Sequence, residues 1–226
     1  MKKLLLLTAV LTAVVLAGST AMALAPLGPP TSDLKCGQFG VGIDYAYDST
    51  KVKVDSTTDR LKTNMLSANL GYGIMDDWKG YARLGLSSIK EDVFNGNWGF
   101  AWGLGTKYTF LKQDKLDWGA LFQLDWLRSS DKIDGVNAKI KPYDIVLAVG
   151  PTYQISDTVS IYGGPLLQWV RGSVSAGDVS AQIREKQMFG GYFGAEAKLC
   201  EMTSVFGEIQ FTGTGWGIGT GINWKF

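Results

Sequence analysis

The chain has 226 residues, no histidine, two cysteines and 29 glycines, and its formal net charge is +1. Without histidine it cannot form a Ser-His or Cys-His catalytic arrangement, and it lacks the commonest protein ligand of metals. The balanced charge argues against a surface that binds nucleic acid, and a hydrophobic content of 46% excludes a disordered chain.

The first 23 residues have the pattern of a secretory signal peptide. A pair of lysines precedes an uncharged apolar run over 4–17, and Ala-x-Ala motifs follow at 21–23 and 23–25. The apolar run is short for a membrane span, although a retained anchor is the alternative. We expect cleavage after Ala23, because cleavage after Ala25 would leave a proline at the start of the mature chain. The mature protein is therefore predicted to be exported.

Residues 24–37 hold three of the six prolines, which predicts an extended lead-in without regular structure. From Gln38 onward, apolar and polar residues alternate with a period of two, and the helical period of 3.6 never takes over. No stretch in this region is apolar and uncharged for 18 residues, so no transmembrane helix is expected. The alternation predicts ten strands at 38–48, 60–74, 78–90, 97–111, 115–128, 139–155, 158–171, 182–199, 203–212 and 215–226.

The connections between these strands are alternately short and long. Short turns are expected around positions 76, 113, 156 and 201. The longer connections are polar and rich in glycine, serine and aspartate, and they are expected as loops at 48–59, 92–96, 129–138 and 172–181.

The two faces of the predicted strands differ in composition. One face is apolar and aromatic, whereas the other carries many of the glycines and sparse charges of both signs. The water-facing side of a soluble barrel would be dense in lysine and glutamate, and glycine weakens an exposed strand. Glycine suits the crowded inside of a narrow barrel, so the apolar face should point outward into lipid. The charged residues assigned to the inside are Asp44, Arg83, Lys107, Asp117, Asp125, Asp144, Glu196, Lys198, Glu208 and Lys225.

Aromatic residues on the apolar face gather toward the strand ends. Trp118 and Trp126, like Tyr143 and Tyr153, lie eight to ten residues apart on one strand. At about 3.3 Å per residue and a tilt near 40°, this separation is roughly 20–25 Å in height. A barrel that spans a bilayer has an apolar band of about 25 Å between two aromatic girdles. The pattern predicts an all-β fold, a single antiparallel up-and-down transmembrane β-barrel over 38–226.

The sequence resembles the transmembrane β-barrel proteins of Gram-negative outer membranes. The resemblance covers the signal peptide and the strands, and it is most specific at the end, where Trp224 and the terminal Phe226 resemble the signal read by the barrel assembly machinery. It implies an outer-membrane location, contact with outer-membrane lipid, longer outer loops, and termini and short turns in the periplasm, so that 24–37 becomes a periplasmic lead-in. Ten strands satisfy the even number found in such barrels, and eight is the alternative.

Two prolines depart from the pattern of this family. Pro151 and Pro165 fall within predicted strands, where each removes a hydrogen bond of the ladder. They indicate β-bulges near the hairpin of the sixth and seventh strands.

The charges assigned to the lumen predict a paired network and no catalytic site. The enzymes that this family contains resemble one another in using a catalytic histidine, which this chain lacks. Carboxylates on the inner face have basic companions, and charges inside a narrow barrel must be paired or reach water. We therefore expect no enzymatic activity, no cofactor and no metal.

Cys36 precedes the first strand, and Cys200 lies at the turn after the eighth. The resemblance places both on the periplasmic side, where disulfides persist. They form either a disulfide that ties the lead-in to the rim or two separate thiols.

The sequence is compatible with three alternative functions. The first is an integral outer-membrane protein with a structural or general envelope role, because the lumen of a small barrel is filled by side chains. The second is a porin-like channel for small solutes, since ten strands and many inner glycines could leave an open path. The third is a surface-binding module that uses the loops at 129–138 and 172–181.

Overall fold

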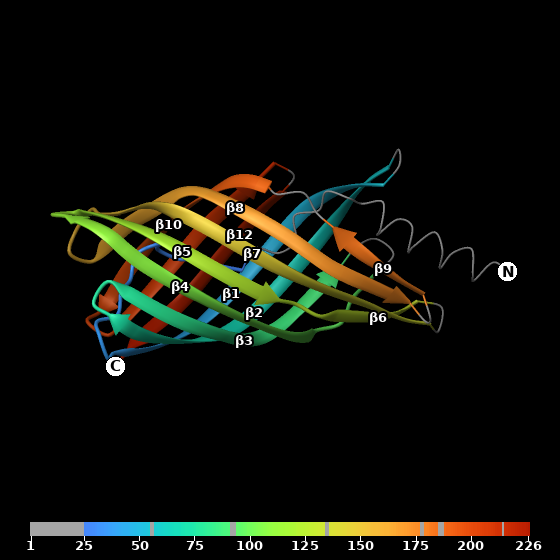
Figure 1. The fold of residues 1–226 in the computed structure, drawn as a ribbon, viewed down its shortest axis with the longest axis horizontal. Helices are drawn as coiled ribbons and strands as arrows, with labels where there is room; N and C mark the ends of the chain where they lie inside the picture. Colours follow the sequence, from blue (N-terminus) through green and yellow to red (C-terminus); the bar gives the residue numbers. More distant parts are fainter. Residues whose placement is uncertain are drawn as a thin grey trace.

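The computed structural model describes residues 25–54, 57–90, 94–133, 136–176, 179–184, 188–213 and 215–226. These residues form one antiparallel sheet that rolls into an elongated barrel (Figure 1). Among them, no helix is long and apolar enough to cross a bilayer. The strands are β1 (Phe39–Val54), β2 (Thr57–Met75), β3 (Trp78–Lys90), β4 (Gly99–Gln113), β5 (Leu116–Trp126), β6 (Ser129–Ile133), β7 (Val136–Gln154), β8 (Val159–Ala176), β9 (Val179–Arg184), β10 (Met188–Cys200), β11 (Thr203–Thr212) and β12 (Gly215–Lys225).

Ten of the twelve strands close the ring. Strand β1 pairs with both β2 and β12, and β7 pairs with β8 in addition to β5, so the sheet has no open edge over the body of the barrel. Strand β6 lies beside the outer part of β7, in line with β5, and β9 lies beside the outer part of β8, in line with β10. The predicted ten-stranded, up-and-down barrel is therefore confirmed, with β6 and β9 as two extra strands.

The two ends of the barrel differ. The short turns around 76, 114, 156 and 201 lie at one end, together with the seam where Phe226 and Phe39 exchange backbone hydrogen bonds of 2.9 and 3.3 Å (Figure 1). At the other end the strands continue beyond the body of the barrel. We call the first end the turn end and the second the hairpin end.

The connections at the hairpin end correct the prediction of long loops. Pairing of β1 with β2 continues to Val54 and Thr57, and β6 and β9 form hairpins with β7 and β8 across most of 129–138 and 172–181. Each added pair satisfies further backbone N–H and C=O groups, so the ladder continues even where polar residues replace the apolar face.

The outer surface of the barrel is apolar. Large side chains on alternate positions are exposed around the ring, for example Leu84 at 60%, Phe100 at 56% and Phe193 at 54%. Soluble monomers rarely expose an apolar surface of this extent. Buried charged and amide side chains such as Asp44, Arg83 and Gln123 lie at the intervening positions, on the inside, as the alternation predicts for a barrel in lipid.

The ladder between β7 and β8 is interrupted near the turn end. Pairing stops at Ala148 with Leu166 and resumes at Thr152 with Tyr162. Pro151 and Pro165 lie within this gap. The register is the same on both sides of it, so neither strand has an extra residue, and the predicted β-bulge is corrected to an interruption of the ladder. Glycines at positions 150 and 163 let the two backbones come close enough that a Cβ on Gly150 would collide with the carbonyl oxygen of Gly163.

Replacement of Leu84 by arginine tests the outward orientation of the apolar face. Leu84→Arg puts a charge into the middle of the lipid-facing band, and we expect it to lower the free energy of unfolding by about 2–4 kcal/mol. Ile74→Arg, close to the turn end, is the matched control and should cost about 0–1 kcal/mol. Urea unfolding in phospholipid vesicles measures both. Equal effects at the two positions would contradict a membrane-spanning band.

Candidate functional site in the barrel lumen

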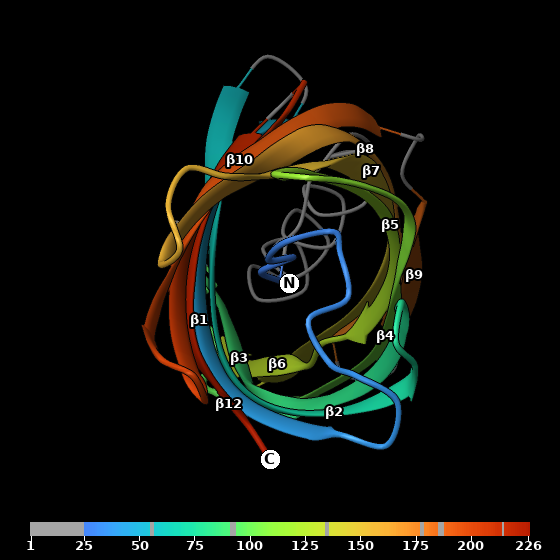
Figure 2. The same cartoon turned by 90° about the vertical axis from the view of Figure 1, so that its left-hand side faces the viewer.

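The segment that leads into β1 lies inside the barrel. Viewed end-on, the ring of strands encloses the blue trace that precedes β1 (Figure 2). Ala25, Leu27 and Leu34 are at most 3% exposed. We call residues 25–34 the lumen segment. The prediction that 24–37 is a periplasmic lead-in is therefore corrected for these residues, although the segment lacks regular structure as its prolines predict.

Glycines of the wall make room for the lumen segment. A Cβ on Gly119 would lie 2.5 Å from the carbonyl oxygen of Pro30, and one on Gly219 would lie 2.9 Å from the ring of Pro26. Both distances are shorter than a carbon atom tolerates, so larger residues at these positions would displace the segment. The glycines of the inner face thus leave a groove that the chain itself fills.

Four side chains of the wall donate hydrogen bonds to backbone carbonyls of the lumen segment. Arg83 on β3 donates to the carbonyl of Pro26 at 2.9 Å. Lys107 on β4 donates to the carbonyls of Leu27 and Pro29 at 2.5 and 2.8 Å. Gln123 on β5 and Gln210 on β11 both donate to the carbonyl of Ala25, at 3.4 and 3.2 Å.

Glu208 on β11 binds the backbone N–H groups of the same segment. Its two carboxylate oxygens accept from the N–H of Leu27 at 2.7 Å and from that of Gly28 at 2.8 Å. The carboxylate also accepts from the hydroxyl of Tyr162 and from the amide of Gln210. Glu208 is 4% exposed, and these four donors replace the water that a buried carboxylate loses.

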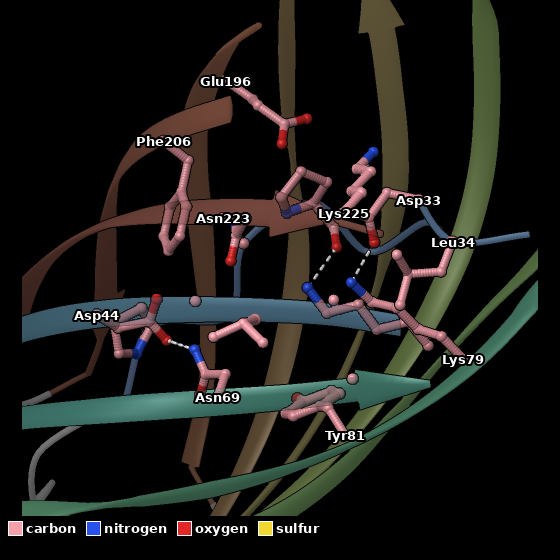
Figure 3. Close-up of a pocket in the computed structure, with 18 of the residues that line it drawn as sticks. Asp33, Leu34, Asp44, Asn69, Lys79, Tyr81, Glu196, Phe206, Asn223 and Lys225 are labelled. Carbon is pink, nitrogen blue, oxygen red and sulfur yellow. Dashed lines mark hydrogen bonds and ion pairs between the residues drawn. The ribbon is translucent and has the colours of Figure 1, made fainter. Parts of the chain in front are cut away.

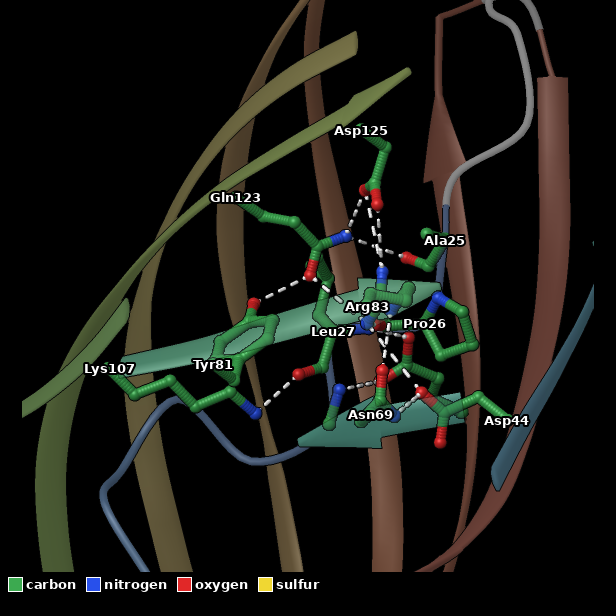
Figure 4. Close-up of polar contacts among 12 residues, drawn as sticks. Ala25, Pro26, Leu27, Asp44, Asn69, Tyr81, Arg83, Lys107, Gln123 and Asp125 are labelled. Carbon is green, nitrogen blue, oxygen red and sulfur yellow. Dashed lines mark hydrogen bonds and ion pairs between the residues drawn. The ribbon is translucent and has the colours of Figure 1, made fainter. Parts of the chain in front are cut away.

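Arg83 is the centre of a buried ionic network (Figure 4). Its guanidinium lies 3.3 Å from a carboxylate oxygen of Asp125 and 3.6 Å from one of Asp44, and it donates to the amide oxygen of Asn69 at 2.9 Å. Asn69 in turn donates to Asp44. Arg83, Asp44 and Asp125 are all at most 3% exposed. One cation therefore compensates two buried carboxylates while it also binds the carbonyl of Pro26.

At the turn end, an ion pair anchors the other part of the lumen segment. Asp33 contacts the ammonium groups of Lys79 on β3 and Lys225 on β12, the latter at 3.3 Å (Figure 3). Burial raises the pKa of the Asp33 carboxyl, but the two lysines outweigh it and hold this pKa below its ordinary value. Asp33 therefore stays ionised at neutral pH.

The lumen segment borders a small cavity of the wall. A cavity of about 70 Å³ lies against β1, β2, β3 and β12, lined among others by Leu34, Asp44, Tyr81 and Asn223 (Figure 3). This volume holds only a few water molecules. At the turn end, a wider hollow of about 450 Å³ is lined by Asp33 and by residues of the rim.

The residues assigned to the lumen from sequence fall into three groups. Asp44, Arg83, Lys107, Asp125 and Glu208 join the network around the lumen segment, whereas Asp144 binds Gln168. The sequence analysis does not name Lys79, Gln123 and Gln210, although the inner-face phase of the alternation could have identified them. The buried residues are Asp44, Arg83, Lys107, Asp125, Asp144 and Glu208, the half-buried ones are Asp117, Glu196 and Lys225, and Lys198 is exposed.

The terminal aromatic residues lie at the seam. Trp224 pairs with Val41 of β1 and Thr203 of β11, and Phe226 is 67% exposed beside Phe39. Their role as an assembly signal stays a prediction. Among the described residues, no group of three or more cysteine, aspartate or glutamate side chains could hold a metal ion.

Comparison with known proteins places the chain in a family. A family model described as "outer membrane protein beta-barrel domain" matches residues 76–226. The chain therefore belongs to the outer membrane β-barrel family, and the predicted outer-membrane location agrees with this membership. No curated protein matches the sequence.

Solved structures that share the fold include the following two. The translocator domain of the autotransporter NalP from Neisseria meningitidis is 10% identical, with a TM-score of 0.54 over 86% of this chain and 90% of that one. An outer membrane channel from Pseudomonas putida F1 is also 10% identical, with a TM-score of 0.52 over 90% of this chain and all of that one. At this identity the similarity concerns the fold alone.

Removal of the Arg83 cation should destabilise the barrel. Arg83→Met leaves Asp44 and Asp125 buried without their compensating charge, and we expect a loss of about 3–5 kcal/mol in the free energy of unfolding. Lys112→Met breaks the exposed ion pair with Asp77 and should cost about 0–1 kcal/mol. Urea titration in vesicles compares the two variants. A loss below 1 kcal/mol for Arg83→Met would contradict the proposed ionic centre.

Alkylation decides the state of the two cysteines. Cys36 and Cys200 are free and exposed thiols in the structure, and both lie at the turn end. The disulfide between them stays a prediction. If it forms in oxidised protein, neither thiol should react with an alkylating reagent before reduction, and mass spectrometry counts the added groups. Two groups added without reductant would rule the bridge out.

Proposed function

We propose that this outer membrane β-barrel protein has a structural or general envelope role and that the lumen segment keeps its barrel closed. The observation that carries the proposal is the occupied lumen, in which wall side chains from β3, β4, β5 and β11 bind the backbone of residues 25–29. A path for free diffusion would instead leave these polar side chains to water.

The porin-like channel is the second candidate. Ten strands enclose a lumen wider than that of the smallest barrels. A channel would require the lumen segment to leave, because residues 25–29 occupy the wall side chains that would otherwise line a water-filled path. The resident segment therefore favours a closed barrel.

The surface-binding module is the third candidate. Its predicted contact loops at 129–138 and 172–181 are short hairpins, in which β6 pairs with β7 and β9 pairs with β8. Hairpins of this length offer little area for a specific protein interface, which buries about 800 Å² on each partner. A surface-binding function therefore has less support than a closed barrel.

An enzymatic role has little chemical support. The chain has no histidine, and the buried carboxylates Asp125 and Glu208 are engaged by Arg83 and by the lumen segment. We therefore assign no catalytic residue and no cofactor. The partners in this proposal are outer-membrane lipid on the apolar face and, during biogenesis, the barrel assembly machinery at Trp224 and Phe226. Export is proposed to follow cleavage after Ala23.

Single-channel recording in a planar bilayer tests closure of the lumen. The mature chain is expected to insert and stay silent, whereas a variant that lacks residues 25–34 should conduct, because only wall side chains then remain in the ring. Separate migration of heated and unheated samples on a gel verifies that both variants are folded. Steady conductance of the mature chain would contradict the closed barrel and favour the channel. A folded but silent deletion variant would show that the segment is not what closes it.

A further inference from the structure

The wall recognises the lumen segment largely through its main chain. Over residues 25–29, the carbonyls of Ala25, Pro26, Leu27 and Pro29 accept hydrogen bonds from side chains of the wall. The N–H groups of Leu27 and Gly28 donate to Glu208. Recognition of this kind depends on the backbone of the bound segment more than on its side chains.

The lumen segment is not a strand of the sheet. Among the described residues, the first backbone-to-backbone hydrogen bond that ties this part of the chain to a strand is from the N–H of Gly37 to the carbonyl of Gly73. Prolines at positions 26, 29 and 30 have no N–H to give to a ladder and favour an extended conformation. The segment therefore occupies the lumen as a bound peptide does, held by side chains of a wall whose strands pair with one another.

We propose that the lumen is a binding site for an extended, proline-containing peptide, and that residues 25–34 are its tethered and displaceable ligand. The proposal rests on the closed barrel proposed above and identifies the chemistry that closes it. A free peptide of the same sequence binds at the same site once the resident segment is cut from β1.

Three contacts define which peptide the site accepts. Glu208 requires two successive N–H groups, so neither position 27 nor position 28 of the ligand can be proline. Gly28 has a φ of +64°, and a Cβ there would lie 3.2 Å from the Nζ of Lys107, so position 28 of the ligand strongly favours glycine. An acidic residue at position 33 pairs with Lys79 and Lys225.

The turn end provides the route for exchange. The hollow of about 450 Å³ there is lined by Asp33, Lys35, Gln38, Lys225 and Phe226, among others, so the anchored end of the segment lies at an opening of the barrel. Cys36 and Gly37, which join the segment to β1, are exposed. No Cβ contact restricts the position of Gly37.

The experiment uses the full chain, folded before it is cut. A recognition sequence for a site-specific protease is inserted at the exposed turn of Cys36 and Gly37, and the refolded barrel is cleaved in detergent. A fluorescent synthetic peptide of residues 24–36 is then added in excess. We expect the cut segment to exchange with this peptide, measured by fluorescence anisotropy, and the barrel to conduct while the site is empty and to close when peptide is added.

Matched peptides test the recognition chemistry. Methylation of the Leu27 nitrogen removes one hydrogen bond to Glu208 and should weaken binding about tenfold or more. Gly28→Ala should weaken it at least as much, because an L residue is strained at this φ. Ser32→Ala keeps the N–H that Thr109 accepts and should bind within about threefold of the parent peptide.

Several outcomes overturn the proposal. A cut segment that never exchanges, a folded empty barrel that binds no peptide, or a barrel that unfolds when the segment leaves would show that residues 25–34 are part of the fold and not a ligand. Equal binding of the N-methylated and parent peptides would show that the hydrogen bond to Glu208 does not contribute to recognition. Failure of the proposed closure is seen separately, as conductance of the uncut chain.

Discussion

Every part of this structure follows from the inability of hydrocarbon to form hydrogen bonds. A backbone N–H or C=O that faced lipid unpaired would cost several kcal/mol, so the strands must close into a ring. Pairing of β1 with β12 closes the ring and satisfies the backbone hydrogen bonds. The barrel then has an outer and an inner surface, which require opposite kinds of side chain. The outside must be apolar, as Leu84 and Phe193 are, and polar side chains can lie only inside.

The inside has its own constraint, because it is too narrow to hydrate many charges. Two buried carboxylates, Asp44 and Asp125, share the guanidinium of Arg83, which has donors left for a carbonyl. Glu208 and Lys107 likewise have hydrogen-bonding capacity that their wall neighbours do not use. The backbone of the lumen segment supplies both partners at once, since each peptide unit offers an acceptor and, outside proline, a donor. The segment is thus complementary to a polar wall through groups that every peptide carries.

This complementarity explains what could be predicted from sequence and what could not. The parts of the strands that cross lipid were found because alternation is enforced there on every residue, from Phe39 to Trp224. The strand ends at the hairpin end are predicted as loops because they are polar and rich in glycine, serine and aspartate, although Lys51 to Val54 and Ser173 to Ala176 still alternate. The alternate position of each charged residue on its strand predicts that its side chain faces inward. The position of the lumen segment left no such signal, since Glu208 binds main-chain groups 180 and 181 residues away, and these groups are the same in any sequence.

The contacts of the lumen segment come from opposite sides of the ring, and this links its binding to the topology of assembly. Arg83 on β3 and Glu208 on β11 lie on strands whose connection around the barrel runs through the seam of β1 and β12. An open sheet that still lacks this seam cannot present both side chains to one peptide. Occupancy of the lumen and closure of the ring are therefore thermodynamically coupled, and each stabilises the other by the same free energy. Binding of residues 25–34 thus favours the pairing of β1 with the last strand, although nearly the whole sequence separates the segment from that strand.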